Sequence, residues 1–166
     1  LNQTYKNIEY IVIDGGSEDE TIDIIKKYQK NLSYWESGKD DGPSDALNRG
    51  FNNATGDIFG YINSDDLLHK DAVKIAVKNL KRGFNFFHGT IIFIDHNSKP
   101  LSNNLLNIFP PQTVNFKRYF CGAVIGQQGS FFTKNVYKQS EKFNIKNTTM
   151  WDMEFYLNAL KNNFKI

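Results

Sequence analysis

Short apolar runs alternate with amphipathic segments along the first part of the chain. Residues 8–14, 32–37 and 58–62 are short runs rich in apolar side chains, bounded by polar or glycine positions. Runs of this kind are typical of buried strands. Between the first two runs, residues 18–31 repeat their apolar side chains at helical spacing. The pattern predicts a strand, a helix and a second strand, joined as a right-handed β-α-β unit.

Capping residues predict where the first two helices begin. Ser17 followed by Glu20 has the spacing of a capping box, in which the serine hydroxyl binds a free amide at the helix start. The polar loop GKDDGPSD comes after the second strand. Within it, Ser44 is expected to cap a helix over residues 45–53.

The same alternation continues beyond the third strand. Residues 71–81 predict an amphipathic helix that Gly83 closes. A strand is expected over residues 90–95, and residues 96–112 are predicted to be a loop. Strands that alternate with helices indicate an α/β fold with a mainly parallel sheet flanked by helices. The length of 166 residues fits one domain spanning residues 1–166.

Composition and charge exclude several classes of protein. The net charge is only +2 and the basic residues are scattered along the sequence, so no electrostatic footprint for nucleic acid is expected. Cys121 is the one cysteine, which fits a reducing, cytosolic setting. Apolar runs stop well short of the roughly 20 residues that span a bilayer. Neither a transmembrane helix nor a signal peptide is predicted.

Acidic residues follow two of the predicted strands. Asp14 ends the first strand, and Asp65 and Asp66 follow the third. Ligands of open α/β sheets bind outside the carboxyl ends of the strands, so these groups are expected at one rim. Neighbouring carboxylates favour a hard cation such as Mg²⁺ or Mn²⁺, which would bridge a diphosphate. The alternative is that Asp65 and Asp66 are solvated turn residues, since aspartate is common in turns.

The glycine turn after the first strand has an equally simple alternative. Gly15, Gly16 and Ser17 suit any tight strand-to-helix turn. The turn has neither the glycine spacing of a dinucleotide-binding fingerprint nor a P-loop lysine, which disfavours a dehydrogenase or a P-loop enzyme. The free amides of a helix start there could still attract phosphate.

Five segments taken together resemble a known family. In chain order they are LNQTYKNIEYIVIDGGSEDET, DDGPSDALNRGFNNATGDIFGYINSDD, FHGTIIFID, IGQQGSFF and WDMEFYLNAL. They are similar to the family 2 glycosyltransferases, inverting enzymes of the GT-A fold that include bacterial polysaccharide-synthesis enzymes. The family's opening strand, which lies in the middle of the sheet, has no counterpart here. The chain is therefore expected to be an N-terminally incomplete catalytic domain.

The resemblance implies a role for each matching residue. Asp14 matches the acid that contacts the uracil of a UDP-sugar, and Asp65 and Asp66 match the DXD-type motif. Asp66 is then the metal ligand for Mn²⁺ or Mg²⁺, while Asp65 contacts the ribose or sugar of the donor. The remaining matches are donor contacts and a general base: Gly16, Ser17, Asp45, Asn48 and, as the base, Asp152.

Two positions carry alternatives of their own. Asp152 would also be favoured in the first turn of any helix, because the helix dipole attracts negative charge. Gln127 stands where related sequences often have histidine, which leaves the contacts to the acceptor open. His69, His88, His96, Ser130 and Cys121 show no triad spacing and are expected to be structural or surface residues.

The mechanism implied by the resemblance is a single displacement with inversion at the anomeric carbon. The partners would be a nucleotide-sugar donor and a saccharide or lipid-linked saccharide acceptor. A cytoplasmic enzyme, peripherally associated with the inner face of the cell membrane, is the expected setting. Two alternatives remain open: a catalytically inactive nucleotide-sugar-binding module and a nucleotidyltransferase, although no glycine-rich basic loop follows the first strand.

Overall fold

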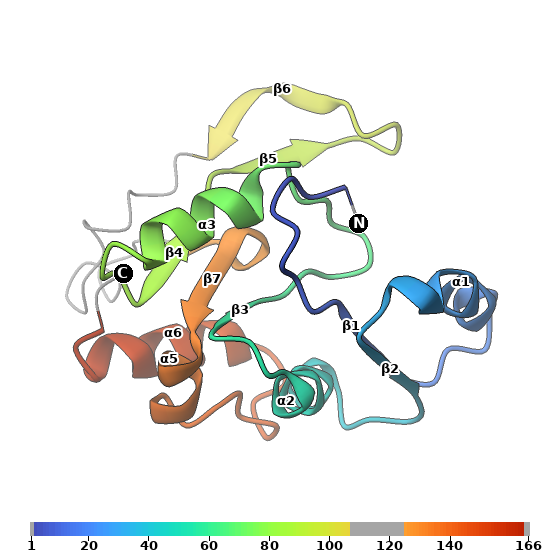
Figure 1. The fold of residues 1–166 in the computed structure, drawn as a ribbon, viewed down its shortest axis with the longest axis horizontal. Coiled ribbons are helices and arrows are strands. Elements are labelled where there is room, and N and C mark those ends of the chain that lie inside the picture. The colour runs from blue at the N-terminus through green and yellow to red at the C-terminus, as the bar shows by residue number, and fades with distance from the viewer. Residues whose placement is uncertain (1, 107–124, 165–166) are drawn as a thin grey trace.

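The computed structural model describes residues 2–106 and 125–164 (Figure 1). Its helices and strands in chain order are β1 (Ile11–Asp14), α1 (Thr21–Tyr28), η1 (Gln29–Asn31), β2 (Tyr34–Ser37), α2 (Pro43–Asn53), β3 (Ile58–Gly60), α3 (Ala72–Leu80), β4 (Phe86–His88), β5 (Ile91–Ile94), β6 (Pro100–Leu106), η3 (Gln127–Gly129), β7 (Ser130–Thr133), α5 (Lys134–Gln139) and α6 (Trp151–Lys161). The expected α/β class is confirmed. Cys121 lies outside the described residues.

The first predicted unit is present. β1 and β2 pair in parallel, with Ile11 opposite Tyr34 and Asp14 opposite Ser37, and α1 connects them. α2 packs against β1, where the backbone at Gly50 lies close to Ile13. The ends of both strands therefore meet at one edge, beside the start of α2.

The prediction of a mainly parallel sheet is wrong for the described strands. β3 and β4 each pair antiparallel with β7, and β5 pairs antiparallel with β6, so β1–β2 is the one parallel ladder. Because β3 and β4 share an antiparallel neighbour, they run in the same direction, as a strand-helix-strand unit requires. β7, which arrives from far along the chain, separates them.

A hairpin replaces part of the predicted loop. β5 confirms the strand expected over residues 90–95, but Pro100–Leu106 forms β6, and residues 107–112 of the predicted loop lie outside the described part of the chain. The turn is held by the carboxylate of Asp95, which accepts hydrogen bonds from the amides of Asn97 and Lys99 at 2.8 and 2.9 Å. This local turn brings the two strands together.

Both predicted serine caps are wrong. Ser17 does not cap α1, which begins at Thr21 with Glu20 at its N-cap; the Ser17 hydroxyl donates to the carboxylate of Asp14. Ser44 lies inside α2 and is buried; the helix begins at Pro43, after Gly42 with a φ of +101°. Proline suits the first helical position because its fixed φ is helical and its missing amide hydrogen would have had no partner there.

α3 follows its prediction more closely. It ends at Leu80, shortly before Gly83, which has the left-handed φ of +96° expected of a closing glycine. The short strand β4 that follows was not predicted. No helix in the described part of the chain is long and apolar enough to cross a membrane.

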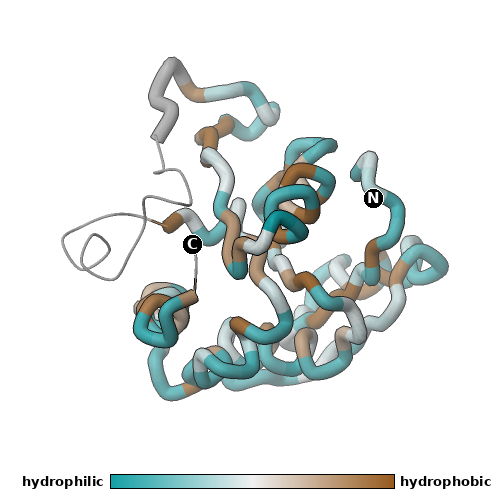
Figure 2. The backbone as a smooth tube through the Cα atoms, turned by 60° about the vertical axis from the view of Figure 1, so that its left-hand side comes forward, coloured by the Kyte–Doolittle hydropathy of each residue, from teal (hydrophilic) through white to brown (hydrophobic). Residues whose placement is uncertain are grey.

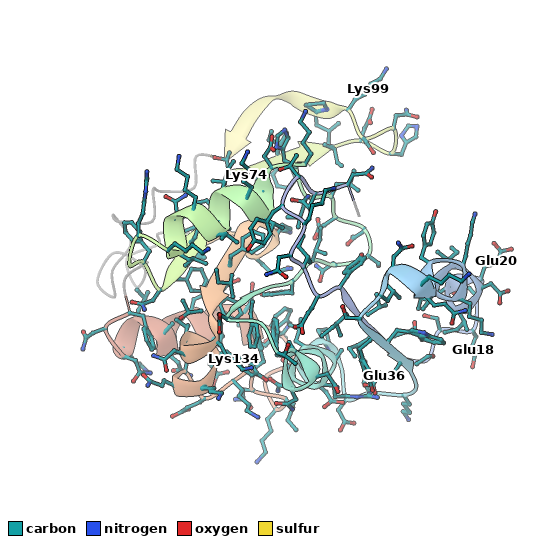
Figure 3. All side chains as sticks on the ribbon, in the orientation of Figure 1. Glu18, Glu20, Glu36, Lys74, Lys99 and Lys134 are labelled. Atoms are coloured by element: carbon teal, nitrogen blue, oxygen red, sulfur yellow. The ribbon has the colours of Figure 1, made fainter. Side chains whose placement is uncertain are left out.

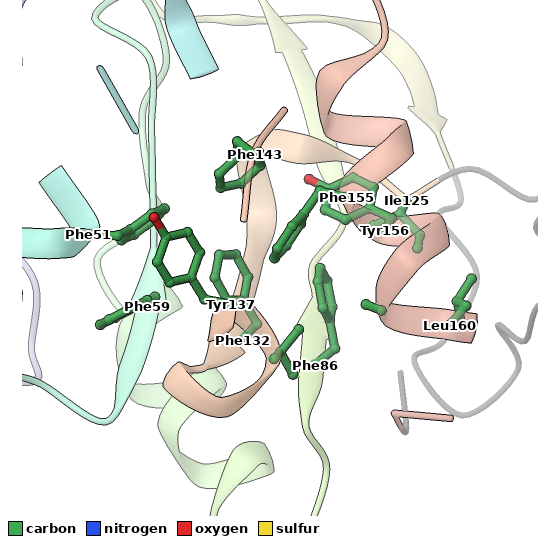
Figure 4. Close-up of a cluster of buried hydrophobic side chains, with 12 residues drawn as sticks. Phe51, Phe59, Phe86, Ile125, Phe132, Tyr137, Phe143, Phe155, Tyr156 and Leu160 are labelled. Atoms are coloured by element: carbon green, nitrogen blue, oxygen red, sulfur yellow. The ribbon is translucent and has the colours of Figure 1, made fainter. Parts of the chain in front are cut away.

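Aromatic side chains fill the main core (Figure 4). Phe51 of α2 stacks on Phe59 of β3 at 4.8 Å between ring centroids, and Phe132 of β7 packs against Phe155 of α6 at 5.0 Å. The backbone coloured by hydropathy shows hydrophobic and hydrophilic positions mixed along the coiled segments (Figure 2). Much of the high aromatic content is therefore core, and this core fixes α2 and α6 against the central strands.

Candidate active site

The carboxylate of Asp14 organises the end of β1. Asp14 is only 7% exposed. Its Oδ2 accepts hydrogen bonds from the amides of Gly16 and Ser17, both at 3.0 Å, and from the Ser37 hydroxyl at 2.6 Å. Its Oδ1 accepts the Ser17 hydroxyl at 2.5 Å. Gly16 has a φ of +93°, a left-handed conformation that glycine adopts without strain.

These donors keep Asp14 ionised. The hydroxyls of Ser17 and Ser37 are the largest cause, and together with the two amides they lower the pKa of Asp14 to about 2, although burial opposes them. Oδ1 has one protein donor and can accept another bond. A ligand N–H could therefore reach a carboxylate that is already fixed in place.

Asp40 is a second acid at this edge that sequence analysis missed. It lies in the loop between β2 and α2, and its Oδ1 accepts a hydrogen bond from the amide of Gly42 at 2.9 Å. A Cβ added to Gly15 would lie 2.9 Å from Asp40 Oδ2, so the carboxylate rests directly against the glycine turn. The signal in the sequence was the acidic pair in GKDDGPSD, which predicts a loop but not where it folds back.

The side chain of Asn48 ties α2 to the segment after α5. Its Nδ2 donates to the Phe143 carbonyl at 2.8 Å, and its Oδ1 accepts from the Tyr137 hydroxyl at 2.9 Å and the Phe143 amide at 3.1 Å. Only one amide hydrogen is left for a ligand. Asn48 thus has a clear structural role in addition to the donor contact predicted for it.

Asp45 lies at the start of α2, facing the same loop as Asp40. Its Oδ2 accepts from the Asp41 amide at 3.3 Å and lies 3.9 Å from Arg49, one turn on. Arg49 also makes a 2.8 Å ion pair with Glu36 of β2. The group ties the start of α2 to the parallel strands.

The turn after β3 contains a very different carboxylate. Asp65 is exposed and Asp66 is half-buried. Burial, and next the charge of Asp65, raises the pKa of Asp66. Its Oδ2 is buried and has no hydrogen-bond partner among the described residues. A buried carboxylate oxygen without a partner is costly, which makes this atom a candidate to bind a cation or a donor group.

Gln127 approaches the same turn from η3. The Asn63 side chain donates to Gln127 Oε1 at 3.2 Å, while Gln127 Nε2 is buried without a partner among the described residues. η3 itself is held beside the end of β4, because the Gly89 amide donates a hydrogen bond to the Gly129 carbonyl at 3.0 Å. The two backbones cross closely here: a Cβ at Gly129 would lie 3.1 Å from the Gly89 nitrogen. The residue that replaces the expected histidine therefore borders the acidic turn.

The acidic turn suits a hard cation only with outside ligands. Among the described residues, no group of three or more His, Cys, Asp or Glu side chains could hold a metal by itself. Mg²⁺ is commonly held by one or two carboxylates together with substrate phosphates and water. Asp66, with its unpartnered oxygen, and Asp65 beside it fit that arrangement.

Asp152 lies in the first turn of α6, beside a buried chain of hydroxyl groups. Tyr156, one turn further, places its hydroxyl 3.2 Å from that of Tyr61 and 3.4 Å from that of Ser130. Burial raises the pKa of Tyr156, and the charge of Asp152 adds to this. Tyr61 directly follows β3, so this contact joins α6 to the strand that leads into the acidic turn.

The structure thus gathers the predicted residues in two groups. Asp14, Gly16 and Ser17 form the turn at the end of β1, and Asp45 and Asn48 lie on α2, which packs on β1. Asp65 and Asp66 lie in the turn after β3, and Asp152 lies at the start of α6, which the contact between the Tyr61 and Tyr156 hydroxyls joins to the end of β3. α2 joins the groups, because it packs on β1 and its Phe51 stacks on β3. The described residues show no hydrogen bond or ion pair directly between the two groups.

Sequence comparison supports one family for this chain. Residues 1–156 match the family described as glycosyl transferase family 2. The chain belongs to this family. An uncharacterized glycosyltransferase of Haemophilus influenzae is 31% identical over 169 residues, which cover 97% of this chain and 63% of that protein. One of Mycobacterium tuberculosis is 28% identical over 95% of this chain and 59% of its own length.

Structural comparison agrees on the fold. The crystal structure of Staphylococcus aureus TarS residues 1–349 in complex with UDP is similar, with a TM-score of 0.74 and 19% sequence identity. The match covers 97% of this chain and 48% of that one. The family 2 chain described here thus shares the fold of TarS, and it spans about half to two thirds of the length of these three chains.

Proposed function

We propose that this family 2 chain transfers a sugar from a UDP-sugar donor to an acceptor hydroxyl, with inversion at the anomeric carbon. The observation that supports it best is the unpartnered, buried Oδ2 of Asp66, in a turn whose Asn63 also contacts Gln127. The similar TarS structure is a complex with UDP. A nucleotidyltransferase has no such support from the family match.

The donor's uridine would lie at the end of β1. Oδ1 of Asp14 can accept the N–H of a uracil ring, and the ionised carboxylate is already held rigid by its donors. Gly16 and Ser17 leave room for the base, while Asp45 and the remaining amide hydrogen of Asn48 face the donor from α2. Asp65 would contact the ribose or the sugar. In this proposal, the binding energy comes from groups that need no rearrangement.

The diphosphate would lie against the acidic turn. Asp66, assisted by Asp65, would hold Mn²⁺ or Mg²⁺ there, and the bound ion would stabilise the negative charge of the departing UDP. Asp152 would accept the proton of the acceptor hydroxyl as the new bond to the anomeric carbon forms. The buried hydroxyls of Tyr156 and Tyr61 fix the helix turn that carries this base. No covalent intermediate is needed.

The acceptor would be a saccharide or a lipid-linked saccharide. Gln127 borders the acidic turn, and its buried Nε2 offers a free hydrogen-bond donor to an acceptor oxygen. This amide would take the place of the histidine expected from the resemblance.

The test is release of UDP from UDP-sugars with Mn²⁺, compared between the unchanged chain and Asp152→Asn. Loss of a general base lowers turnover by about 10²–10⁴-fold. We therefore expect turnover to collapse in this variant while UDP binding, measured by calorimetry, stays the same. Asp23→Asn is the matched control, because Asp23 is an exposed acid in the first turn of α1.

Three results would count against the proposal. Equal losses in Asp152→Asn and Asp23→Asn would mean that only helix-dipole effects are involved. Unchanged turnover in Asp152→Asn would remove it as base. UDP binding without any turnover in the unchanged chain would favour the inactive nucleotide-sugar-binding module.

A further inference from the structure

The charges of the chain are unevenly divided, although their sum is small. Residues 1–66 contain six basic and thirteen acidic residues, which gives a net charge of −7. Residues 67–166 contain fourteen basic and five acidic residues, which gives a net charge of +9. The segment around β1 and α1 is therefore acidic, and the part beginning at α3 is basic. Such an asymmetry is a physical signal for an anionic partner.

The basic residues form a stripe on α3. Lys70, Lys74, Lys78 and Arg82 follow one another at intervals of four residues along α3 and its two ends, and all four are exposed. Side chains at this spacing lie on the same side of a helix. Asp71 is the one acid within residues 70–82, and it is held by the Thr4 hydroxyl at 2.7 Å. The stripe is thus nearly free of compensating charge.

Exposed apolar side chains lie at the same end of the molecule. Ile75 of α3 is 47% exposed, and Ile92, Phe93 and Leu101 of the β5–β6 hairpin are 50–52% exposed. Figures 1 and 2 both show the hairpin at one edge of the molecule, next to α3. Lys74 of α3 and Lys99 of the hairpin turn are labelled on this side in Figure 3.

We propose that this α3–hairpin surface docks on an anionic lipid bilayer. A soluble polyanion would be bound by the basic stripe alone and would leave Ile92 and Phe93 in water. A bilayer uses both kinds of group, because basic residues are attracted to anionic headgroups while apolar side chains enter the interface. The combination on the α3–hairpin surface therefore fits a bilayer best.

The surface is continuous with the candidate active site. α3 begins at Ala72, soon after the Asp66 turn, and the root of the hairpin at Gly89 is bonded to Gly129, in the same η3 turn as Gln127. Docking would therefore bring the Gln127 side of the site toward the membrane, where a lipid-linked hydroxyl would be found. The docking itself needs neither donor nor turnover, so it stands apart from the proposed function.

The test is co-sedimentation of the chain with vesicles of neutral phosphatidylcholine, alone or mixed with phosphatidylglycerol. We expect binding to the mixed vesicles only, weakening as salt is added because screening shortens the reach of the charges. Each lysine near an anionic surface strengthens binding by about fivefold. Lys70→Gln, Lys74→Gln and Lys78→Gln together should therefore weaken binding by about 100-fold.

Two further variants distinguish docking on a bilayer from a general charge effect and from a purely electrostatic partner. Lys26→Gln, Lys27→Gln and Lys30→Gln together remove the same charge from exposed positions on and just after α1 and should have little effect. Phe93→Gln should weaken binding to mixed vesicles while circular dichroism stays unchanged. The proposal is overturned if the unchanged chain does not bind mixed vesicles, or if the α1 variant loses as much affinity as the α3 variant. It is also overturned if Phe93→Gln has no effect, because binding would then be purely electrostatic.

Discussion

Asp14 ends strand β1 and Asp66 lies in the turn after β3, and their carboxylates lie in opposite environments. Asp14 accepts four hydrogen bonds and its pKa is lowered to about 2. Asp66 has a buried oxygen without a partner among the described residues, and its pKa is raised. A carboxylate with all these donors, such as Asp14, holds a turn together, whereas the unpartnered oxygen of Asp66 is still able to bind a ligand. Position at a strand end alone does not distinguish these roles.

Among the variants that separate these two carboxylates, Asp66→Asn should have the largest effect. Removing one group that stabilises developing negative charge typically costs about 10²–10³-fold in turnover. Asp66 is proposed to hold the ion that does this, so we expect a loss of that size in Mn²⁺-dependent UDP release. The melting temperature should stay the same or rise, since a poorly solvated charge is removed. Asp57→Asn, an exposed acid just before β3, is the control. Full activity in Asp66→Asn would end the metal role.

Asp14→Ala should act mainly on stability. It leaves the amides and hydroxyls that bind the carboxylate without their partner, so the free energy of unfolding should fall by about 2–3 kcal/mol. Ser17→Ala removes one of these donors and should cost about 1 kcal/mol. Urea unfolding measures both. A larger loss in Ser17→Ala than in Asp14→Ala would contradict the central role of the carboxylate.

The same lowered pKa gives a pH dependence. The unfolded chain binds a proton at Asp14 near the usual pKa of 3.8, while the folded chain does so only near 2. The stabilisation by Asp14 is therefore complete above about pH 4 and is lost as the pH falls toward 2. Asp14→Ala should flatten the dependence of the unfolding free energy on pH in that window.

A second pH effect is expected at His88, a buried polar group without charge. His88 is 3% exposed, neither ring nitrogen has a partner among the described residues, and burial lowers its pKa to about 4. The unfolded chain takes up the proton near pH 6.5, so stability should decrease as the pH falls from about 6.5 toward 4. His88→Phe should remove this decrease in thermal melts at about pH 5. An identical pH profile for both chains would contradict it.

Local patterns predicted the elements that depend on neighbouring residues. The β1–α1–β2 unit follows from apolar runs and helical spacing, and α3 from its amphipathic pattern and Gly83. Ser17 also had the right spacing for a capping box, but α1 begins only at Thr21, with Glu20 before it. The prediction failed because Ser17 belongs to the turn that its amide and hydroxyl form with the Asp14 carboxylate.

The remaining errors come from contacts between distant residues. β7 separates β3 from β4 through pairs such as Phe59 with Phe132, and no periodicity within residues 58–88 could reveal that insertion. The aromatic core that selects it is assembled from α2, β3, β4, β7 and α6. The roles predicted for the candidate site residues stay predictions, while their placement in two groups, with Asp40 and Gln127 as neighbours, came from the fold.

The close crossing of Gly89 and Gly129 bears on protein engineering. A Cβ at position 129 would lie 3.1 Å from the Gly89 nitrogen, so the backbone at this crossing, two residues from Gln127, would have to give by a few tenths of an ångström. Libraries designed to change acceptor preference should therefore randomise positions 127 and 128 and keep glycine at 129. The backbone around each new side chain then stays the same.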